Sequence, residues 1–207
     1  MTDARGRRPF DAVLCDVDNV IRFYDASRVT ALERAAGLAE GITMKVAFAP
    51  ETDHPLMLGR IGMQEWVHEV VAGFAGLAPE PVAFELATAL AEAPFHADDT
   101  VVSLLRRART VMPLVLLSNA PVTLEADLDA LGLSDLADHL VSSARVGLVK
   151  PNPRIYRIAA DLAGVPLDRC LFVDDTLENV ETAAALGMSV VHFREPDDLR
   201  RALAPLL

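Results

Sequence analysis

The sequence predicts an α/β fold: a doubly wound, mostly parallel five-stranded sheet with an all-helical block inserted after the first strand. Three observations predict it. Short apolar runs recur along the chain, helical patterns lie between the later runs, and residues 27–94 carry helical patterns without a convincing strand. Strands that alternate with helices of this length are typical of a parallel sheet with helices on both faces.

Each strand candidate is short, continuously apolar and followed by polar or acidic residues. Such runs are typical of strands that are buried on both faces of a parallel sheet. The five candidates are residues 12–15, 114–117, 139–142, 170–173 and 189–193.

Helices are predicted where apolar residues recur three or four positions apart and the pattern stops at a glycine. A pattern at residues 124–131 stops at Gly132, one at 155–162 stops at Gly164, and one at 180–186 stops at Gly187. We expect the charged segment at 194–201 to form an exposed terminal helix.

Two parts of the chain follow from these patterns. We expect residues 25–96 to form a helical unit, and residues 1–24 plus 97–207 to form the sheet-containing core.

Trp66 and Phe74 share one predicted helical face, which we interpret as the core of the helical unit rather than a stacking platform. Asp98 stands where the N-cap of the helix before the second strand is expected.

Composition narrows the function. The chain has 207 residues and a formal net charge of −11, which argues against binding to a nucleic-acid backbone because such proteins neutralise phosphates with clustered Lys and Arg. No apolar stretch approaches the roughly 18 residues needed to cross a bilayer. The two cysteines, Cys15 and Cys170, lie inside apolar runs. We interpret them as residues of the protein core, in a protein that resides in a reducing compartment.

We therefore expect a cytoplasmic protein that binds neither nucleic acid nor membrane. We also expect residues 1–9 to be a frayed terminus rather than a signal peptide.

Chemistry-bearing residues follow the predicted strands. Ligands of an open parallel sheet bind at the carboxyl ends of its strands, so these residues are expected at one edge. They are Asp16 and Asp18 after the first strand, Ser118 and Asn119 after the second, Lys150 beyond the third, and Asp174 and Asp175 after the fourth.

This combination indicates a magnesium site that binds phosphate. Clustered carboxylates repel one another unless a cation neutralises them, and all-oxygen ligands suit a hard ion such as Mg²⁺. A nearby lysine and hydroxyl supply donors to phosphoryl oxygens. Each residue alone has an ordinary interpretation, as a turn former, loop residue or surface charge. These interpretations do not explain why all of them are expected at one edge of the sheet.

Four motifs in order resemble the haloacid dehalogenase superfamily of hydrolases: a hydrophobic strand into DVDNV, then LLSN, the lysine of GLVKP, and LFVDDTLENV. The resemblance covers nearly the whole chain. It implies a Rossmannoid core with a small helical cap of the C1 type (subfamily I), in which the helical block of residues 25–96 is the cap.

The resemblance also implies roles. Asp16 would be the nucleophile that becomes an aspartyl phosphate, and Asp18 would exchange protons with the leaving oxygen and then with water. Lys150 would stabilise the nucleophile and the transferring group. Ser118, with the backbone amides of Asn119 and Ala120, would hold the phosphoryl oxygens.

A Mg²⁺ site is implied as well. Asp16 and Asp175, with the main-chain carbonyl of Asp18, would ligate the ion. Asp174 would act beside them, either directly or through water, and the sequence leaves that choice open. Asn179 would orient Lys150 or a metal ligand.

One departure from the family pattern concerns Asn19, which stands where the family usually has glycine after the second aspartate. Asparagine tolerates left-handed backbone geometry, so we expect the turn to survive. Asp18 itself favours phosphoryl chemistry, because the resemblance implies a non-acidic residue at this position in true dehalogenases. Dehalogenation is therefore disfavoured.

The prediction is a phosphatase of a small phosphorylated metabolite. Two alternatives stay open: a phosphomutase of sugar phosphates that uses the same intermediate, and a weakly active or non-catalytic binding protein on this scaffold. Arg60 could contact a second anionic group of the substrate or be an ordinary solvated arginine, and Arg22, Phe23 and Tyr24 lie where a cap hinge is expected. The substrate and the oligomeric state do not follow from the sequence.

Overall fold

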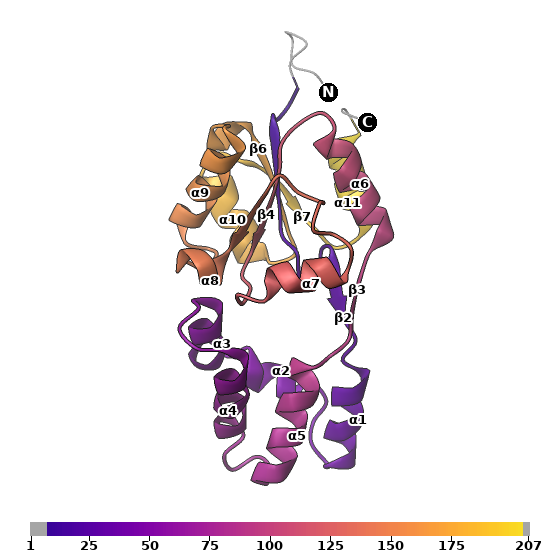
Figure 1. The fold of residues 1–207 in the computed structure, drawn as a ribbon, viewed down its shortest axis with the longest axis vertical. Coiled ribbons are helices and arrows are strands. Elements are labelled where there is room, and N and C mark those ends of the chain that lie inside the picture. The colour runs from indigo at the N-terminus through magenta and orange to yellow at the C-terminus, as the bar shows by residue number, and fades with distance from the viewer. Residues whose placement is uncertain (1–7, 205–207) are drawn as a thin grey trace.

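A computed structural model describes residues 8–204 and contains a five-stranded parallel sheet (Figure 1). The strand order is β5-β4-β1-β6-β7, so the first strand of the chain lies in the middle. The predicted strands are confirmed, with ends that differ by one residue in three of them. The strands are β1 (Ala12–Cys15), β4 (Leu114–Ser118), β5 (His139–Ser142), β6 (Cys170–Asp174) and β7 (Ser189–His192).

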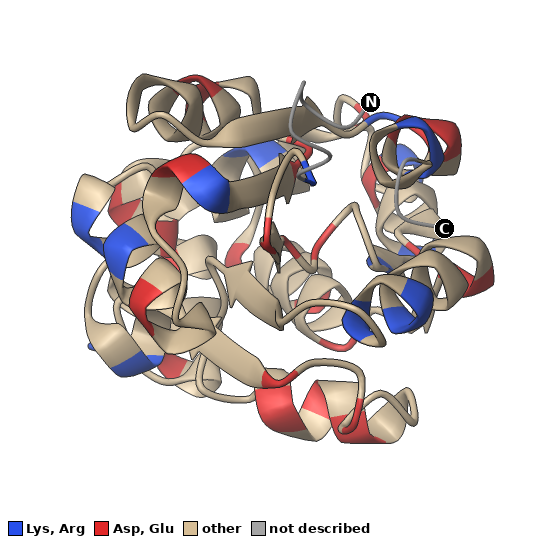
Figure 2. Ribbon diagram, turned by 90° about the horizontal axis from the view of Figure 1, so that it is seen from above, with Lys and Arg blue, Asp and Glu red and all other residues tan. Residues whose placement is uncertain are grey.

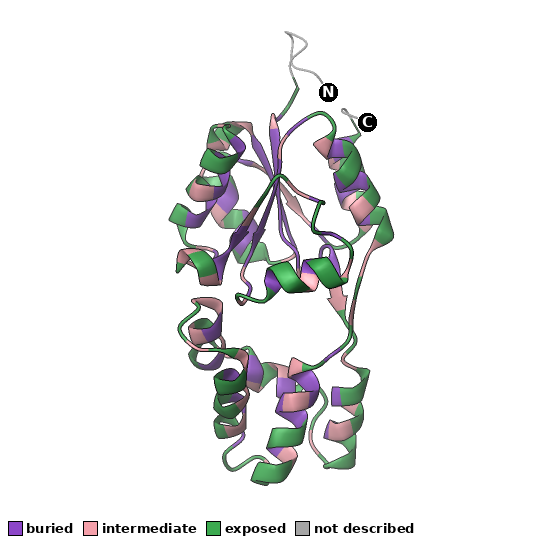
Figure 3. Cartoon of the chain, in the orientation of Figure 1, coloured by how far each residue is buried: buried purple, intermediate pink, exposed green. Residues whose placement is uncertain are grey.

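The central strand explains why the apolar runs are continuous. Successive side chains of a strand point to opposite faces, and both faces of β1 are covered. Val13 and Cys15 belong to one buried cluster, while Ala12 and Leu14 belong to another. The three central strands β1, β4 and β6 are buried along their whole length, whereas the edge strand β7 is half-buried (Figure 3).

Helices supply the apolar cover on the two faces. On the side of Val13 lie α6 (Asp99–Arg109), α7 (Leu124–Ala130) and α11 (Pro196–Leu203). On the side of Leu14 lie α9 (Pro153–Ala163) and α10 (Leu177–Ala185). The predicted helices at residues 124–131, 155–162 and 180–186 are thus confirmed, and the glycine that follows each has a left-handed φ between 67° and 90°.

The terminal helix is less exposed than its charges suggested. Leu199 and Leu203 of α11 are fully buried, and α11 packs against α6. Its Arg and Asp residues occupy the opposite face, which is the amphipathic pattern of a surface helix. The prediction of an exposed helix was therefore wrong for one of its faces.

A block of five helices is inserted after the first strand. It comprises α1 (Ser27–Ala35), α2 (Ile42–Ala47), α3 (Pro50–Met57), α4 (Met63–Gly73) and α5 (Glu80–Ala91). These helices have their own apolar core, which includes Trp66, Val70, Phe74 and Leu86. Figure 1 shows the helical block beyond the edge of the sheet at which the strands end.

The chain enters and leaves the helical block through a short antiparallel ribbon that the sequence did not predict. Its strands are β2 (Arg22–Tyr24) and β3 (Phe95–Ala97). Three-residue strands with mixed polarity carry no periodic signal, so the pattern missed them. The predicted division at 24/25 and 96/97 falls within or beside this ribbon and stays a prediction.

A second contact joins the helical block to the core. The hydroxyl of Ser143, in α8 (Ser143–Val146), donates to the carbonyl of Met57 at 2.6 Å. Gly59 lies so close to Ala144 that an added Cβ would come within 2.6 Å of its carbonyl oxygen, and its φ is +67°. Glycine is required there on both counts.

Charged residues of both signs are interspersed on the helices (Figure 2). Arg106 and Arg109 of α6, for example, pair with Asp135 and Asp138, which lie between α7 and β5. Within residues 8–204, none of the helices has both the length and the apolar character that crossing a bilayer requires.

The N-cap of α6 offers a test of the fold. The carboxylate of Asp98 accepts hydrogen bonds from the amides of Thr100 and Val101, as predicted. We expect Asp98→Ala to lower the free energy of unfolding by ~1 kcal/mol, because two helix amides lose their acceptor. Urea denaturation measures this, and Asp98→Asn is the control because asparagine caps equally well. Equal losses in both variants would contradict the capping role.

Candidate active site

Side chains from three neighbouring strand ends meet at one edge of the sheet. Asp16 follows β1, Ser118 ends β4 and Asp174 ends β6, and β1 pairs with both of the other strands. Lys150 arrives from the loop between α8 and α9. The structure thus brings together the residues that the sequence placed at this edge.

Lys150 is the electrostatic centre of this cluster. Its side chain is buried, and its Nζ lies 2.9 Å from Asp16 Oδ1 and 2.6 Å from Asp174 Oδ2. Burial alone would lower the pKa of Lys150, but the two carboxylates outweigh it and raise that pKa above its ordinary value. The lysine therefore stays charged between two acids.

The loop that carries Lys150 is fixed by Asn119. The Asn119 side chain accepts a hydrogen bond from the Lys150 amide at 2.7 Å and donates to the Lys150 carbonyl at 3.0 Å. A residue at the end of β4 thus clamps a backbone segment 31 positions away. The side chain of Asn119 positions Lys150, a function that the sequence did not reveal.

The two acids after β6 have different surroundings. Asp174 is fully buried and accepts hydrogen bonds from Asn179 Nδ2, at 3.0 and 3.2 Å, and from the Thr176 amide at 2.8 Å. Asp175 is partly exposed and lines the cavity described below. Asn179 therefore contacts Asp174, which in turn holds Lys150.

Three carboxylates are close enough to share one ion. Oxygen atoms of Asp16, Asp174 and Asp175 lie within 4.8 Å of one another. Burial raises the pKa of Asp16 to about 7, with Lys150 opposing the shift and Asp174 adding to it. A divalent cation would relieve this repulsion, and an all-oxygen set fits the preference of Mg²⁺. The residues present fit the ion.

The hydroxyl of Ser118 fits a phosphoryl oxygen. Ser118 is buried and lines the same cavity, and within residues 8–204 its Oγ has no hydrogen-bond partner. A buried hydroxyl without a partner is costly. An anionic oxygen in the cavity would accept a hydrogen bond from this hydroxyl.

The backbone amide of Ala120 has a partner in this structure. It donates to the hydroxyl of Ser143 at 3.0 Å, the same hydroxyl that donates to Met57. This amide is therefore bonded within the protein in this structure, and the expectation that it holds a phosphoryl oxygen stays a prediction. The hydroxyl of Ser143, which joins the helical block to the core, accepts the hydrogen bond from this amide.

Asp18 is held by an arginine. Both oxygens of Asp18 accept from Arg22, at 2.7 Å from Nε and 3.0 Å from Nη2, and the third donor of Arg22 lies 2.7 Å from Asp127. Arg22 is almost fully buried, and its guanidinium lies over the rings of Tyr24 and Phe95. The predicted hinge residue thus connects the ribbon to the proton-transfer candidate and to α7.

The turn after Asp18 has the geometry expected for glycine. Asn19 has a φ of 58°, and within residues 8–204 it is the one non-glycine residue with a positive φ. Its amide donates to the Arg22 carbonyl at 2.8 Å. Asparagine tolerates this conformation, so the substitution preserves the turn as predicted.

The site opens into a cavity of about 460 Å³ between the core and the helical block. Asp16, Asp18, Ser118 and Lys150 line its core side, and helices α2 to α5 contribute its other side. Arg60 is exposed, and it is not one of the described residues that line the cavity. The hypothesis that Arg60 faces the substrate finds no support in this structure.

The sequence profile of the haloacid dehalogenase-like hydrolase family matches residues 10–187. The chain belongs to this family. A segment of 61 residues is 43% identical to a phosphatase of Mycobacterium tuberculosis (strain CDC 1551 / Oshkosh), MT3486, and covers 30% of this chain and 28% of that protein. The match therefore extends over less than a third of either sequence.

Solved structures share the fold over most of the chain. A family member from Bacteroides thetaiotaomicron, bt-2542, in complex with magnesium and inorganic phosphate, has a TM-score of 0.68 and 17% identity, with coverage of 89% of this chain and 94% of that one. The L-2-haloacid dehalogenase of Xanthobacter autotrophicus has a TM-score of 0.64 and 23% identity, with coverage of 96% and 84%. At these identities the likeness shows the fold.

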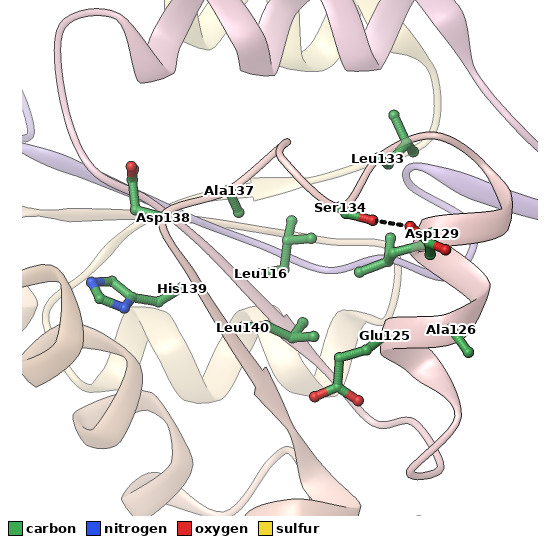
Figure 4. Close-up of a pocket in the computed structure, with 11 residues that line it drawn as sticks. Leu116, Glu125, Ala126, Asp129, Leu133, Ser134, Ala137, Asp138, His139 and Leu140 are labelled. Carbon is green, nitrogen blue, oxygen red and sulfur yellow. Dashed lines mark hydrogen bonds between the residues drawn. The ribbon is translucent and has the colours of Figure 1, made fainter.

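Another cavity, of about 480 Å³, lies at the edge of the sheet, where α7, the segment that follows it and β5 meet (Figure 4). Leu116, Leu140 and Ala137 line it, and Ser134 donates to Asp129 at 2.8 Å along one side. None of the site residues predicted from the family motifs lines this cavity. The chemistry is therefore expected at the cavity beside Asp16.

Asp53, on the helical side of the site cavity, predicts a pH effect. Burial raises its pKa from 3.8 to about 6, with His54 opposing the shift. The folded state therefore binds more protons between pH 4 and 6, so the ionised Asp53 lowers stability increasingly as the pH rises through this range. We expect Asp53→Asn to raise the free energy of unfolding by roughly 1–2 kcal/mol at pH 7.5, with a difference that vanishes towards pH 4.

Urea denaturation of both proteins between pH 4.5 and 7.5 measures this difference. Glu51→Gln, an exposed position two residues earlier in α3, is the control and should show no such pH dependence. A constant difference for Asp53→Asn, or one of opposite sign, would contradict the assignment.

Proposed function

We propose that this protein is a Mg²⁺-dependent hydrolase of a small phosphorylated metabolite, with Asp16 as the nucleophile. The observation that carries the proposal is the buried arrangement in which Lys150 bridges Asp16 and Asp174 beside the hydroxyl of Ser118, which has no partner among residues 8–204. A lysine and a free donor around a carboxylate nucleophile suit a phosphoryl group, whose oxygens carry the charge.

In the first step, a carboxylate oxygen of Asp16 attacks phosphorus, and the bond to the leaving oxygen breaks. Asp18 gives that oxygen its proton, so an alcohol leaves and an aspartyl phosphate remains. In the second step, Asp18 takes a proton from water, which attacks phosphorus and releases phosphate, and the Asp16 carboxylate is restored. Mg²⁺, when bound by Asp16 and Asp175 beside Asp174, would supply positive charge to the phosphoryl oxygens.

Lys150 and Ser118 stabilise the charge of the transferring group. The ammonium of Lys150 contacts Asp16 before any substrate binds. The lysine side chain therefore does not have to move when charge develops on the phosphoryl oxygens. Asn119 and Asn179 keep that ammonium in place, the first through the Lys150 backbone and the second through Asp174.

Asp18 needs one free oxygen to act as an acid. Arg22 binds both of its oxygens in this structure. One of these two contacts would open when substrate enters, which would leave an oxygen of Asp18 for proton transfer to the leaving group. The partial exposure of Asp18 to the cavity supports this.

Three relatives support a phosphatase. The Mycobacterium tuberculosis relative is named a phosphatase, and a segment of 89 residues is 32% identical to flavin mononucleotide hydrolase 1 of Arabidopsis thaliana. The Bacteroides thetaiotaomicron relative holds magnesium and inorganic phosphate. Dehalogenases share the fold at 23% identity or less, and Asp18 favours phosphoryl transfer over halide departure, which needs no proton.

The nucleophile assignment is tested with phosphate release from 4-nitrophenyl phosphate in the presence of Mg²⁺. We expect Asp16→Asn to lower kcat by ~10³-fold or more, because the amide cannot form the covalent intermediate. Asp161→Asn, an exposed position on α9, is the matched control and should release phosphate as the parent protein does. Unchanged release in Asp16→Asn would overturn the proposal.

A further inference from the structure

Two positively charged side chains line the cavity beside Asp16 among the described residues, and each is already paired with carboxylates. Among the described residues that line it, Lys150 and Arg22 are the positively charged side chains. Lys150 lies between Asp16 and Asp174, and Arg22 lies between Asp18 and Asp127. Each cation is thus neutralised by two carboxylates, so neither leaves charge for an anionic group of the substrate other than the transferring phosphate.

The helical side of the cavity is apolar with one exception. The described residues that the helical block contributes are all apolar except Asp53. They include Met44, Phe48, Leu56, Met57, Met63 and Trp66. A surface of this kind binds a hydrocarbon or aromatic group.

Two polar atoms on this side have no partner among residues 8–204. They are Asp53 Oδ1 and Trp66 Nε1, and both are buried. Such groups are costly when they stay unpaired. A carboxylate oxygen accepts hydrogen bonds and attracts cations, and the indole N–H donates.

We infer that the substrate is a phosphomonoester whose leaving group is apolar, has no second anionic group, and has a cationic nitrogen or another hydrogen-bond donor for Asp53. This inference rests on the proposed function, because it assigns the cavity to the leaving group. A second phosphate or carboxylate would meet Asp53 and an apolar wall without a free cation. Like charges brought together against an apolar wall repel each other.

The inference separates the two enzyme alternatives. A phosphomutase of sugar phosphates passes through a bisphosphate, whose second phosphate needs cations in the part of the cavity away from Asp16. The helical block offers Asp53 there and no cation among its described lining residues. Hydrolysis of a monophosphate is the reaction that this charge pattern fits.

Binding of non-hydrolysable phosphonates tests the inference without turnover. The probes are benzylphosphonate, its 4-carboxy derivative and its 4-aminomethyl derivative, titrated by calorimetry in saturating Mg²⁺. We expect the carboxy compound to bind at least ~10-fold more weakly than benzylphosphonate, and the aminomethyl compound to bind as tightly or more tightly. Equal or tighter binding of the carboxy compound would overturn the inference, as would no binding of benzylphosphonate at millimolar concentration.

Two phenylalanines of the helical block give a matched pair of variants. Phe48 lines the cavity and Phe84 does not, and the two side chains are 50% and 49% exposed. We expect Phe48→Arg to improve binding of the carboxy compound ~10-fold or more, since it adds a cation to the cavity, and Phe84→Arg to leave the selectivity unchanged. Equal effects of the two variants would show that the selectivity does not arise in the cavity.

Asp53→Asn completes the set, and it should weaken binding of the aminomethyl compound relative to benzylphosphonate. Turnover of the corresponding benzyl phosphates is measured in parallel. Selective phosphonate binding without phosphate release would sustain the charge selectivity inferred for the cavity and overturn the proposed function. Phosphate release with a preference for the carboxy ester would support the proposed function and overturn the inference about the leaving group.

Discussion

The site depends on one buried ammonium group. Lys150 Nζ is in contact with carboxylate oxygens of Asp16 and Asp174, which end two neighbouring strands of the sheet. Without Lys150, the two carboxylates that contact it would repel each other. Removing a buried charge of this kind leaves its partners uncompensated, so the lysine both permits the acidic cluster to form and orients Asp16, the proposed nucleophile.

Much of this could be predicted from the sequence. Each strand is a short apolar run with acids, a hydroxyl or a helix after it, and the parallel order brings the ends of those runs together. The positions of Asp16, Ser118, Lys150, Asp174 and Asp175 therefore followed from the pattern. The left-handed turn at Asn19 also followed, because few residue types tolerate it.

Other features depend on contacts that no local pattern carries. Asn119 clamps the backbone of Lys150, and Arg22 reaches Asp127 from 105 positions away. The amide of Ala120 was assigned to phosphate, but it is bonded to the hydroxyl of Ser143 that joins the helical block to the core. The helical side of the site cavity is likewise set by how α2 to α5 pack, so its charge pattern appears only in three dimensions.

The most direct measurement asks which atom of the protein carries the phosphoryl group during turnover. The protein is mixed with 4-nitrophenyl phosphate and Mg²⁺, quenched in acid, reduced with borohydride and digested for peptide mass spectrometry. An aspartyl phosphate is reduced to homoserine, and the account predicts this conversion at Asp16, with none in the Asp16→Asn variant. Steady turnover with no converted residue, or conversion at another aspartate, would contradict it.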